Sequence, residues 1–302
     1  MSDLGSFSFR HPAEDDLPEV ASVLGAEERA LRGHVTLGPD ELRDWWRLYD
    51  LDASWLVETG DCEPVGFSGF LAHGDEVTAW VVVDPRYTGR GVSTELLARA
   101  EHRVRELGGD QLRAGALVEN RAARLLLEGL GFREIRRFFR MQVDFDDEPP
   151  QPAELEEISI ATFRDEDAQV FYATMNEAMA DDWGFTSMPF EEWKRFRLEA
   201  PETDTSLWFL AWDGEEAAGV IRCDGKKFGG GFVGALGVRR PWRGRGVGTG
   251  LLHYAFGEYY RRGVKRVSLG VDAQNQSGAT RLYERAGMRA VSEVVTFEKE
   301  LA

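Results

Sequence analysis

The fold of this 302-residue chain is decided by the stretch Val238-Arg-Arg-Pro-Trp-Arg-Gly-Arg-Gly-Val-Gly248. An apolar run, Phe232 to Val238, precedes the loop, and an amphipathic run, Thr249 to Arg262, follows it. This order predicts a strand, a glycine-rich loop and a helix. The three glycines leave no side chain between the backbone and a bound group, and a helix N-terminus attracts negative charge. The loop therefore predicts an anion site, with a pyrophosphate as its expected guest.

Two better-known phosphate-binding loops do not fit this stretch. A P-loop ends in Gly-Lys-Ser/Thr, whereas this loop continues Gly-Val-Gly-Thr and holds no lysine. A dinucleotide-binding loop needs Gly-x-Gly-x-x-Gly and an acidic residue about 20 positions later. The glycines at 246, 248 and 250 do not have that spacing. A plain glycine-rich turn is the alternative that the loop by itself leaves open.

The composition is that of a globular protein, since 43% of the residues are hydrophobic and 29% are charged. The length allows two domains with separate cores. No run of 18 apolar residues occurs, and Met1 to Arg10 lacks the layout of a signal peptide, so we expect no membrane span and a cytoplasmic location. Cys62 and Cys223 are expected to be buried apolar side chains that form neither a disulfide nor a metal site.

The formal net charge of −17 bears on the partners of the protein. Binding to nucleic acid or to an anionic membrane requires a positive surface, so neither is expected. A cationic small molecule is compatible with the charge. We therefore expect a small-molecule partner and no metal, and the oligomeric state stays open.

An acidic, proline-rich segment, Asp144 to Glu157, divides the chain near its middle and predicts a linker. A strand, two helices, a strand hairpin, a strand, a loop, a helix, a strand and a last helix can be traced on either side of it. We predict an N-terminal domain over residues 1–146, a linker over 147–157 and a C-terminal domain over 158–302.

Residues 83–120 align with residues 238–275 at a constant offset of 155, with no gap. The alignment pairs glycines of the two loops, two later glycines and two asparagines: Gly89 with Gly244, Gly91 with Gly246, Gly108 with Gly263, and Asn120 with Asn275. Gly108 and Gly263 are predicted to end the two helices in the left-handed conformation. A repeat of this length predicts a duplicated α/β domain.

Two motifs give each half a resemblance to the GNAT superfamily of acetyl-CoA-dependent N-acetyltransferases. The signature Arg/Gln-x-x-Gly-x-Gly/Ala stands as Arg243-Gly-Arg-Gly246-Val-Gly248, and the later signature runs from Asp272-Ala-Gln-Asn275 to Gly287-Met288. Two such domains in one chain resemble the mycothiol synthase-like tandem acetyltransferases of actinobacteria. The resemblance implies two α/β domains of the α+β kind, each a mostly antiparallel mixed sheet with a splayed parallel strand pair and flanking helices.

The resemblance also implies a site for acetyl-CoA as cosubstrate. The backbone of Leu236, Gly237 and Val238 would pair with the pantetheine arm, and Asn275 would donate a hydrogen bond to it. The residues implied to hold the pyrophosphate are those of the loop, Arg243, Gly244, Arg245, Gly246, Val247, Gly248 and Thr249. Tyr283 would protonate the CoA thiolate as it leaves, a role for which a phenol is chemically suited.

The two halves differ at their chemistry-bearing positions. The N-terminal loop, Thr88-Gly-Arg-Gly91-Val-Ser93, departs from the signature at its first and last positions. Leu127 stands where the C-terminal half has Tyr283 when Gly131 is aligned with Gly287. We therefore predict that the C-terminal domain is catalytic and that the N-terminal domain is structural or binds cofactor only.

The general base is not fixed by the motifs. The glutamate that mycothiol synthase-like domains carry on the strand before the loop has no counterpart between Phe232 and Val238, which contains no acidic residue. Carboxylates that could accept a proton from an amine occur between the first two helices of the C-terminal half, at Glu177, Asp181 and Asp182, and Asp272 is a further candidate.

The resulting expectation is acetyl transfer from acetyl-CoA to a primary amine of a small molecule. Direct attack in a ternary complex is expected, because no cysteine or serine stands where an acetyl-enzyme would need one. Two alternatives stay open from the sequence. One is a non-catalytic, regulatory acyl-CoA-binding protein, and the other is an acetyltransferase of the aminoglycoside type.

Overall fold

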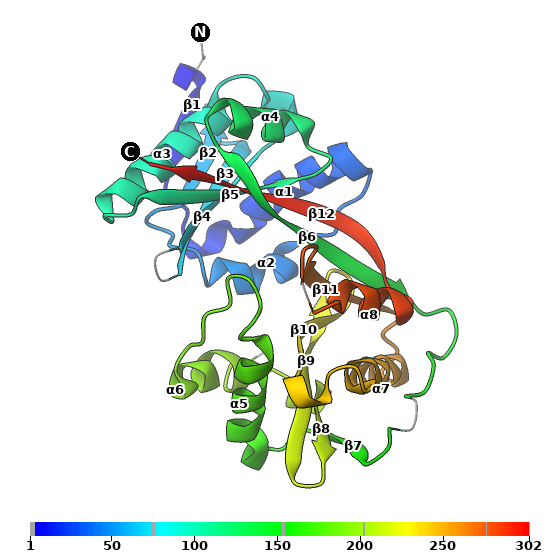
Figure 1. The fold of residues 1–302 in the computed structure, drawn as a ribbon. Helices are drawn as coiled ribbons and strands as arrows, with labels where there is room; N and C mark the ends of the chain where they lie inside the picture. Colours follow the sequence, from blue (N-terminus) through cyan, green and yellow to red (C-terminus); the bar gives the residue numbers. More distant parts are fainter. Residues whose placement is uncertain (1–3, 74–75, 153–154, 202, 276, 302) are drawn as a thin grey trace. The chain divides into compact units, whose positions relative to one another are not determined.

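The computed structural model describes residues 4–73, 76–152, 155–201, 203–275 and 277–301, without the side chains at 40, 41, 44, 73 and 226. Contacts divide the chain into an N-terminal unit, residues 1–138 with 292–302, and a C-terminal unit, residues 139–291. Two strands pass from one unit to the other: β6 (Arg133–Asp144) ends in the C-terminal unit, and β12 (Arg289–Glu300) ends in the N-terminal unit (Figure 1). The predicted domain limits follow the sequence repeat instead, and residues 153 and 154 of the predicted linker lie outside the described residues.

The N-terminal unit is a mixed sheet with helices on both faces. Its strand order is β1 (Phe7–Arg10), β2 (Trp55–Thr59), β3 (Pro64–His73), β4 (Glu76–Val83), β5 (Gln111–Leu117) and the end of β12. Neighbouring strands are antiparallel except β4 and β5, which are parallel. One face, here the α1 face, carries α1 (Leu17–Arg32) and α2 (Pro39–Trp46), and the α3 face carries α3 (Val92–Glu106) and α4 (Arg121–Gly129).

The C-terminal unit repeats this plan. Its strand order is β7 (Ile158–Thr162), β8 (Trp208–Asp213), β9 (Glu216–Lys227), β10 (Gly230–Val238), β11 (Arg266–Asp272) and the end of β6. In Figure 1, α5 (Ala168–Met179) lies on one side of these strands and α7 (Val247–Arg261) on the other. We call these sides the α5 face, which also carries α6 (Phe190–Trp193) and a π-helical turn (Lys194–Leu198), and the α7 face, which also carries α8 (Ala279–Arg285).

Short 3-10 turns join several elements, and four of the described turns form equivalent pairs in the two halves. They are Leu4–Ser6, Glu14–Asp16, Pro85–Tyr87, Asp165–Asp167, Thr205–Leu207 and Arg240–Trp242. The turns at Pro85–Tyr87 and Arg240–Trp242 each carry a proline in the first turn and precede a glycine-rich loop. A proline fixes the φ angle where a helical turn begins, so a conformationally restricted turn precedes each glycine-rich loop.

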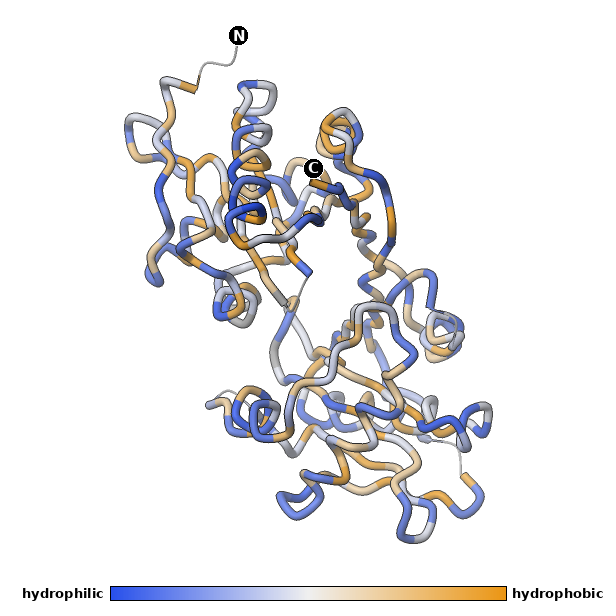
Figure 2. The backbone as a smooth tube through the Cα atoms, turned by 60° about the vertical axis from the view of Figure 1, so that its left-hand side comes forward, coloured by the Kyte–Doolittle hydropathy of each residue, from blue (hydrophilic) through white to orange (hydrophobic). Residues whose placement is uncertain are grey.

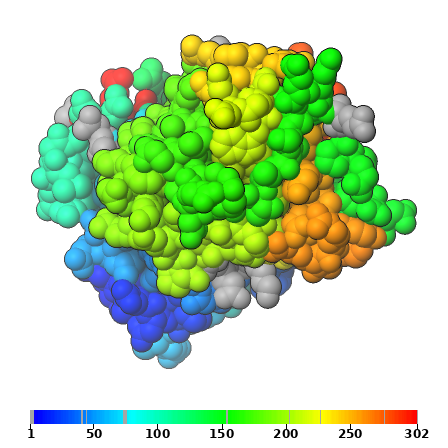
Figure 3. Space-filling model, turned by 90° about the horizontal axis from the view of Figure 1, so that it is seen from below, coloured from blue at the N-terminus to red at the C-terminus, as the bar shows by residue number. Residues whose placement is uncertain are grey.

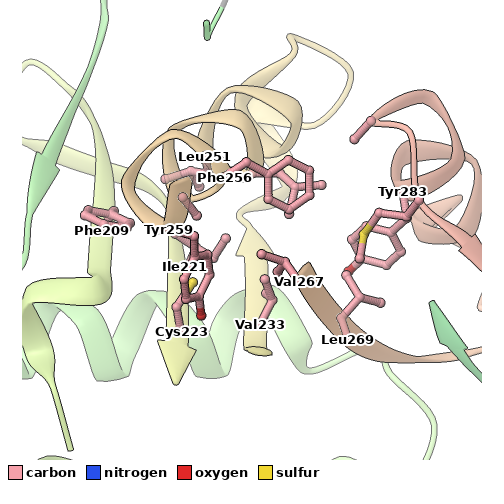
Figure 4. Packing of buried hydrophobic residues seen from close by; sticks show 14 of the residues in the cluster. Phe209, Ile221, Cys223, Val233, Leu251, Phe256, Tyr259, Val267, Leu269 and Tyr283 are labelled. Carbon is pink, nitrogen blue, oxygen red and sulfur yellow. The ribbon is translucent and has the colours of Figure 1, made fainter. Parts of the chain in front are cut away.

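Helices cover the C-terminal sheet on both faces, and β10 runs through its middle. Its buried and partly buried residues alternate along the strand. The core under the α7 face is filled by side chains such as Leu251, Phe256 and Tyr259 of α7 (Figure 4). Apolar residues follow the strands and one side of the helices along the tube of Figure 2, whereas many exposed loops are hydrophilic. The mixed sheet covered on both faces confirms the predicted fold class.

Two local predictions have clear outcomes. Gly108 and Gly263 both adopt a φ of +77°, which confirms the predicted left-handed helix ends. The prediction that both cysteines are buried was wrong for Cys62, which is exposed in the turn between β2 and β3 with a φ of +59°. A turn residue in that conformation points to solvent, whereas Cys223 lies on β9 in the core.

Candidate active site

The glycine-rich loop of the C-terminal unit presents free backbone donors at the start of α7. Gly244 and Gly246 adopt φ values of +79° and +86°, which suit glycine alone, and the helix begins at Val247. In the described chain no protein acceptor bonds to the amides of these three residues or of the next two, Gly248 and Thr249. Free amides at a helix N-terminus can hold an anion. We call this loop the anion cradle, and its binding of a pyrophosphate stays a prediction.

The start of α7 is also packed on its outer side. The Leu155 side chain would lie 3.2 Å from a Cβ at Gly246 and 2.8 Å from one at Gly250. Seen from below, the green segment before β7 borders the orange α7 in Figure 3, in agreement with this contact. Larger residues at 246 and 250 would therefore displace the segment that holds the cradle in place.

The same loop conformation occurs in the N-terminal unit. Gly89 and Gly91 adopt φ values of +81° and +91°, and α3 begins at Val92. The amides of these three residues also have no protein acceptor in the described chain. The anion cradle is therefore duplicated, although the N-terminal sequence departs from the signature.

The two arginines predicted at the C-terminal loop have different surroundings. Arg243 donates to the carbonyl oxygens of Val238 (3.0 Å) and Ala178 (2.9 Å) and pairs with Asp181 (3.3 Å). It therefore ties the end of α5 to the end of β10, and its contact with a pyrophosphate stays a prediction. Arg245 is exposed at the rim of the loop, 3.5 Å from Asp213.

A gap opens between β10 and β11 next to this loop. Their parallel pairing joins Gly231–Val233 to Val267–Leu269, and no pairing links the remaining parts of the two strands in the described chain. A register shift between Val233 and Ala235 places a bulge at Gly234. The predicted splay is confirmed, but it starts inside the strands and not at their ends. The edge of Leu236, Gly237 and Val238 therefore faces the gap, where an extended ligand can pair with it.

The α5 face of this gap is lined by small residues. Ala235 and Gly237 lie on β10, and a Cβ built on Gly270 of β11 would meet no atom within 4 Å. In the N-terminal unit Trp80 stands in place of Ala235, and its Cζ3 atom lies 2.3 Å from a Cβ built on Gly115. The gap is thus open beside Gly270 and filled by an indole ring beside Gly115.

Tyr283 comes from α8 and lies on the α7 side of the gap. Its ring reaches toward Leu269 of β11 (Figure 4), and the residue is only 8% exposed. Its hydroxyl makes no hydrogen bond within the described chain. Burial raises the pKa of the phenol, and the charge of Asp182 acts in the same direction. The phenol therefore stays protonated at neutral pH and is free to donate to a ligand.

Asp182, in the turn after α5, is the candidate base with the most distinctive surroundings. Its carboxylate accepts a hydrogen bond from Nδ2 of Asn275 at 3.0 Å. Burial raises its pKa, against the smaller opposing effects of Asn275 and Arg243. Asn275 is itself held by the amide of Ser277, which donates to its Oδ1 at 2.7 Å. The predicted contact of Asn275 with the cofactor arm stays a prediction, and its observed partner is a carboxylate.

The other candidate carboxylates are engaged with arginines or with the backbone. Glu177 accepts from Arg239 at 2.8 Å. Asp181 accepts from Arg240, and this hydrogen bond is the main reason why its pKa is lowered. Asp272 caps its own turn by accepting from the amide of Gln274 at 2.8 Å. A carboxylate with a lowered pKa is a poor proton acceptor, so Asp181 is the weaker candidate.

A matching carboxyl in the N-terminal unit was missed from the sequence. Glu27 of α1 is buried and accepts a hydrogen bond from Nδ2 of Asn120 at 2.6 Å. Burial raises its pKa, as it does for Asp182. The signal in the sequence is the repeated asparagine, since Asn120 and Asn275 each hold a carboxyl group from the opposite helical layer.

Together these features define a class of protein. Free amides at a helix N-terminus can accept an anion, the adjoining strand edge can pair with an extended ligand, and a carboxyl and a phenol lie at the gap. This is the arrangement of an enzyme that transfers a group from a phosphate-bearing carrier.

The comparisons give the family. The chain belongs to the acetyltransferase (GNAT) family, whose model matches residues 21–132 and 156–288. Both halves are therefore GNAT domains, the protein is an acyltransferase, and its cosubstrate is acetyl-CoA. This confirms the resemblance stated from the two motifs.

Relatives and solved structures agree with this assignment. The chain is 32% identical over 245 residues to the mycothiol acetyltransferase of Thermobispora bispora, covering 77% of this chain and 78% of the relative. It is 29% identical to that of Catenulispora acidiphila, covering 96% and 97%. The crystal structure of a GCN5-related N-acetyltransferase from Sphaerobacter thermophilus is 31% identical, with a TM-score of 0.86 and coverage of 97% and 95%.

A more distant structure shows the tandem fold. The tandem GNAT protein of the clavulanic acid biosynthesis pathway is 17% identical, with a TM-score of 0.74 and coverage of 97% of this chain and 98% of that one. Within the described residues, no helix combines the length and the apolar character that a membrane span requires.

Proposed function

We propose that the chain acetylates a primary amine of a small molecule and that the C-terminal unit alone catalyses the transfer. The observation that carries the proposal is the convergence of Asp182, Asn275 and Tyr283 at the open gap of that unit. Acetyl-CoA supplies a thioester, which an amine attacks with departure of the CoA sulfur. The loop amides and the edge of β10 would hold its pyrophosphate and its arm.

Two side chains account for the proton transfers. Asp182 would accept the proton of the ammonium, because a raised pKa makes the carboxylate a better acceptor near neutral pH. Tyr283 would donate a proton to the departing sulfur, because burial keeps its phenol protonated. Asn275 holds the Asp182 carboxylate by one hydrogen bond and so fixes its position at the gap.

Direct attack of the amine is favoured over an acetyl-enzyme. Cys223 is the cysteine of this unit, and it is buried in the core on the α7 face. Burial raises the pKa of its thiol to about 12, so the nucleophilic thiolate is scarce at neutral pH. A ternary complex of enzyme, acetyl-CoA and amine therefore remains our proposal.

The N-terminal unit lacks what this mechanism requires. Leu127 takes the place of Tyr283 and cannot donate a proton, and Trp80 covers Gly115 where the C-terminal unit is open. The unit keeps its anion cradle and a buried carboxyl, Glu27. We infer a structural or cofactor-binding role for it.

The acceptor is proposed by class. Several relatives are named mycothiol acetyltransferases, so their acceptor is the first to assay. The C-terminal unit carries no acidic residue on the strand before the loop, which is the departure from that group noted in the sequence. The cytoplasmic location stays a prediction from the sequence.

The test is a thiol-release assay with acetyl-CoA and a panel of primary amines that includes the mycothiol acetyltransferase acceptor and an aminoglycoside. We expect amine-dependent release of CoA and the acetylated amine by mass spectrometry. Measurable acetyl-CoA binding without thiol release from any amine would favour the non-catalytic alternative. Strong preference for the aminoglycoside would favour the resistance enzyme.

A further inference from the structure

An arginine lies against the bulge of β10. Arg222 of β9 pairs in register with Ala235 of β10, one residue past the bulge at Gly234. A Cβ built on Gly234 would lie 2.4 Å from Nη2 of this arginine. Glycine at the bulge therefore makes room for the guanidinium at the point where β10 and β11 begin to diverge.

The guanidinium belongs to the α5 face of the C-terminal unit. Arg222 also pairs in register with Trp208 of β8, and residues opposite each other on neighbouring strands project to the same face. Trp208 and Ala235 are both members of the core cluster under α5 and α6. Asp182 lies in the turn that ends α5, so the Arg222 guanidinium and the Asp182 carboxylate both belong to the α5 face.

Several donors of this face have no acceptor among the described residues. Arg222 has a side chain only 14% exposed and uses Nη1 to bond Asp224 at 3.0 Å, whereas its Nε and Nη2 bond to no acceptor in the described chain. The indole Nε1 atoms of Trp193 and Trp208 are buried and also have no acceptor among the described residues. Buried donors without a partner destabilise a fold by about 1–3 kcal/mol each, so a bound group that accepts hydrogen bonds would relieve a real cost.

The acceptor of Arg222 also contacts a second cation. Asp224 is shared between Arg222 and Lys227, whose Nζ lies 3.3 Å from its second carboxylate oxygen. A planar guanidinium with donors that have no acceptor in the described chain, on the same face as two such indole N–H groups, matches a carboxylate.

We infer that the amine acceptor carries a carboxylate, which Arg222, Trp193 and Trp208 bind on the α5 face while Asp182 receives the amine. The inference rests on the proposed function of the C-terminal unit and specifies its substrate class as an amino acid, with a charge of each sign.

The N-terminal unit offers an internal contrast. Gly69 of β3 pairs in register with Trp80, as Arg222 pairs with Ala235. The ring of Tyr49 occupies the space beside it, 2.5 Å from a Cβ built on Gly69. The indole Nε1 of Trp46 is likewise buried there without an acceptor among the described residues. The arginine is not repeated, so the guanidinium distinguishes the unit that we propose to be catalytic.

The test uses matched acceptors that differ only in the carboxylate: ω-amino acids from glycine to 6-aminohexanoate against alkylamines of the same number of methylene groups. With wild-type protein and saturating acetyl-CoA, we expect at least one amino acid to exceed its matched alkylamine about 10- to 100-fold in kcat/KM. Arg222→Gln should abolish the preference by raising KM for the amino acid to that of its matched alkylamine. Lys227→Gln, which removes a cation from the same aspartate, should keep the preference.

A binding readout separates this inference from the proposed function. In the complex with CoA, the ¹⁵N indole signals of Trp193 and Trp208 should shift on addition of the preferred amino acid and not on addition of its matched alkylamine. Equal kinetics and equal or absent indole shifts for the two acceptor series overturn the inference, even if both series are acetylated. Absence of acetylation with any amine overturns the proposed function, and the indole shifts then decide the inference alone.

Discussion

Replacement of Asp182 by asparagine is expected to lower activity and raise stability at neutral pH. The amide keeps the shape of the side chain and can still accept the hydrogen bond of Asn275, so the turn after α5 should persist. It cannot accept a proton from the acceptor ammonium. A positioned general base contributes about 100- to 10,000-fold to a rate, and a 100-fold loss in kcat corresponds to about 2.7 kcal/mol.

The effect on stability follows from the direction of the pKa shift. Burial raises the pKa of Asp182, so the ionised carboxylate is less favourable in the folded protein than in the unfolded chain. The free energy of unfolding therefore decreases as the pH rises from about 4, the unfolded value, through the raised folded value. The variant lacks this decrease. Its thermal midpoint should match wild type below about pH 4 and should be higher than wild type at pH 7.

Glu27→Gln is the matched control, because Glu27 has the same asparagine contact and the same direction of pKa shift in the N-terminal unit. It should raise the thermal midpoint at pH 7 and leave kcat unchanged. The assay is steady-state thiol release at several pH values, beside thermal unfolding of the same samples. Wild-type kcat in Asp182→Asn, or an equal loss of kcat in Glu27→Gln, would refute the assignment of the base.

Two further predictions use paired glycines of the two units. The added methyl group of Gly270→Ala enters open space, so this variant should keep the unfolding midpoint and raise KM for the amine. The methyl group of Gly115→Ala must displace Trp80. That variant should lower the free energy of unfolding in denaturant titration by about 1–3 kcal/mol without changing kcat. Similar behaviour of the two variants would contradict the difference between the gaps. Gly246→Ala and Gly91→Ala both force a non-glycine residue into positive φ, which should lower the free energy of unfolding by about 1–2 kcal/mol in each variant. Only Gly246→Ala should raise KM for acetyl-CoA in initial-rate measurements. Equal increases would show that the N-terminal cradle takes part in turnover.

The sequence allowed the cofactor loop and the duplication to be predicted because both depend on local backbone requirements. Positive φ at positions 244 and 246 requires glycine, so the loop conformation can be read from the sequence. The same glycines occur 155 positions earlier, at Gly89 and Gly91. The helices, hairpins and helix ends follow from short-range periodicity and turn chemistry.

What the sequence could not settle depends on long-range contacts. Asp181 and Asp182 are adjacent carboxylates, and only the fold shows that one pairs with arginines while the other is buried against Asn275. The passage of β6 and β12 between the two units leaves no local signal, because a strand looks the same beside either neighbour. The ring of Trp80 over Gly115 likewise depends on the packing of two strands.

The central claim is that a single site, in the C-terminal unit, performs the chemistry. The most direct test is kcat of Tyr283→Phe with acetyl-CoA and an accepted amine. The hydroxyl makes no hydrogen bond within the described chain, so its removal should leave the fold intact. The account predicts that kcat falls by about 100-fold or more, with both KM values and the thermal midpoint close to wild type. Turnover at the wild-type rate would contradict it.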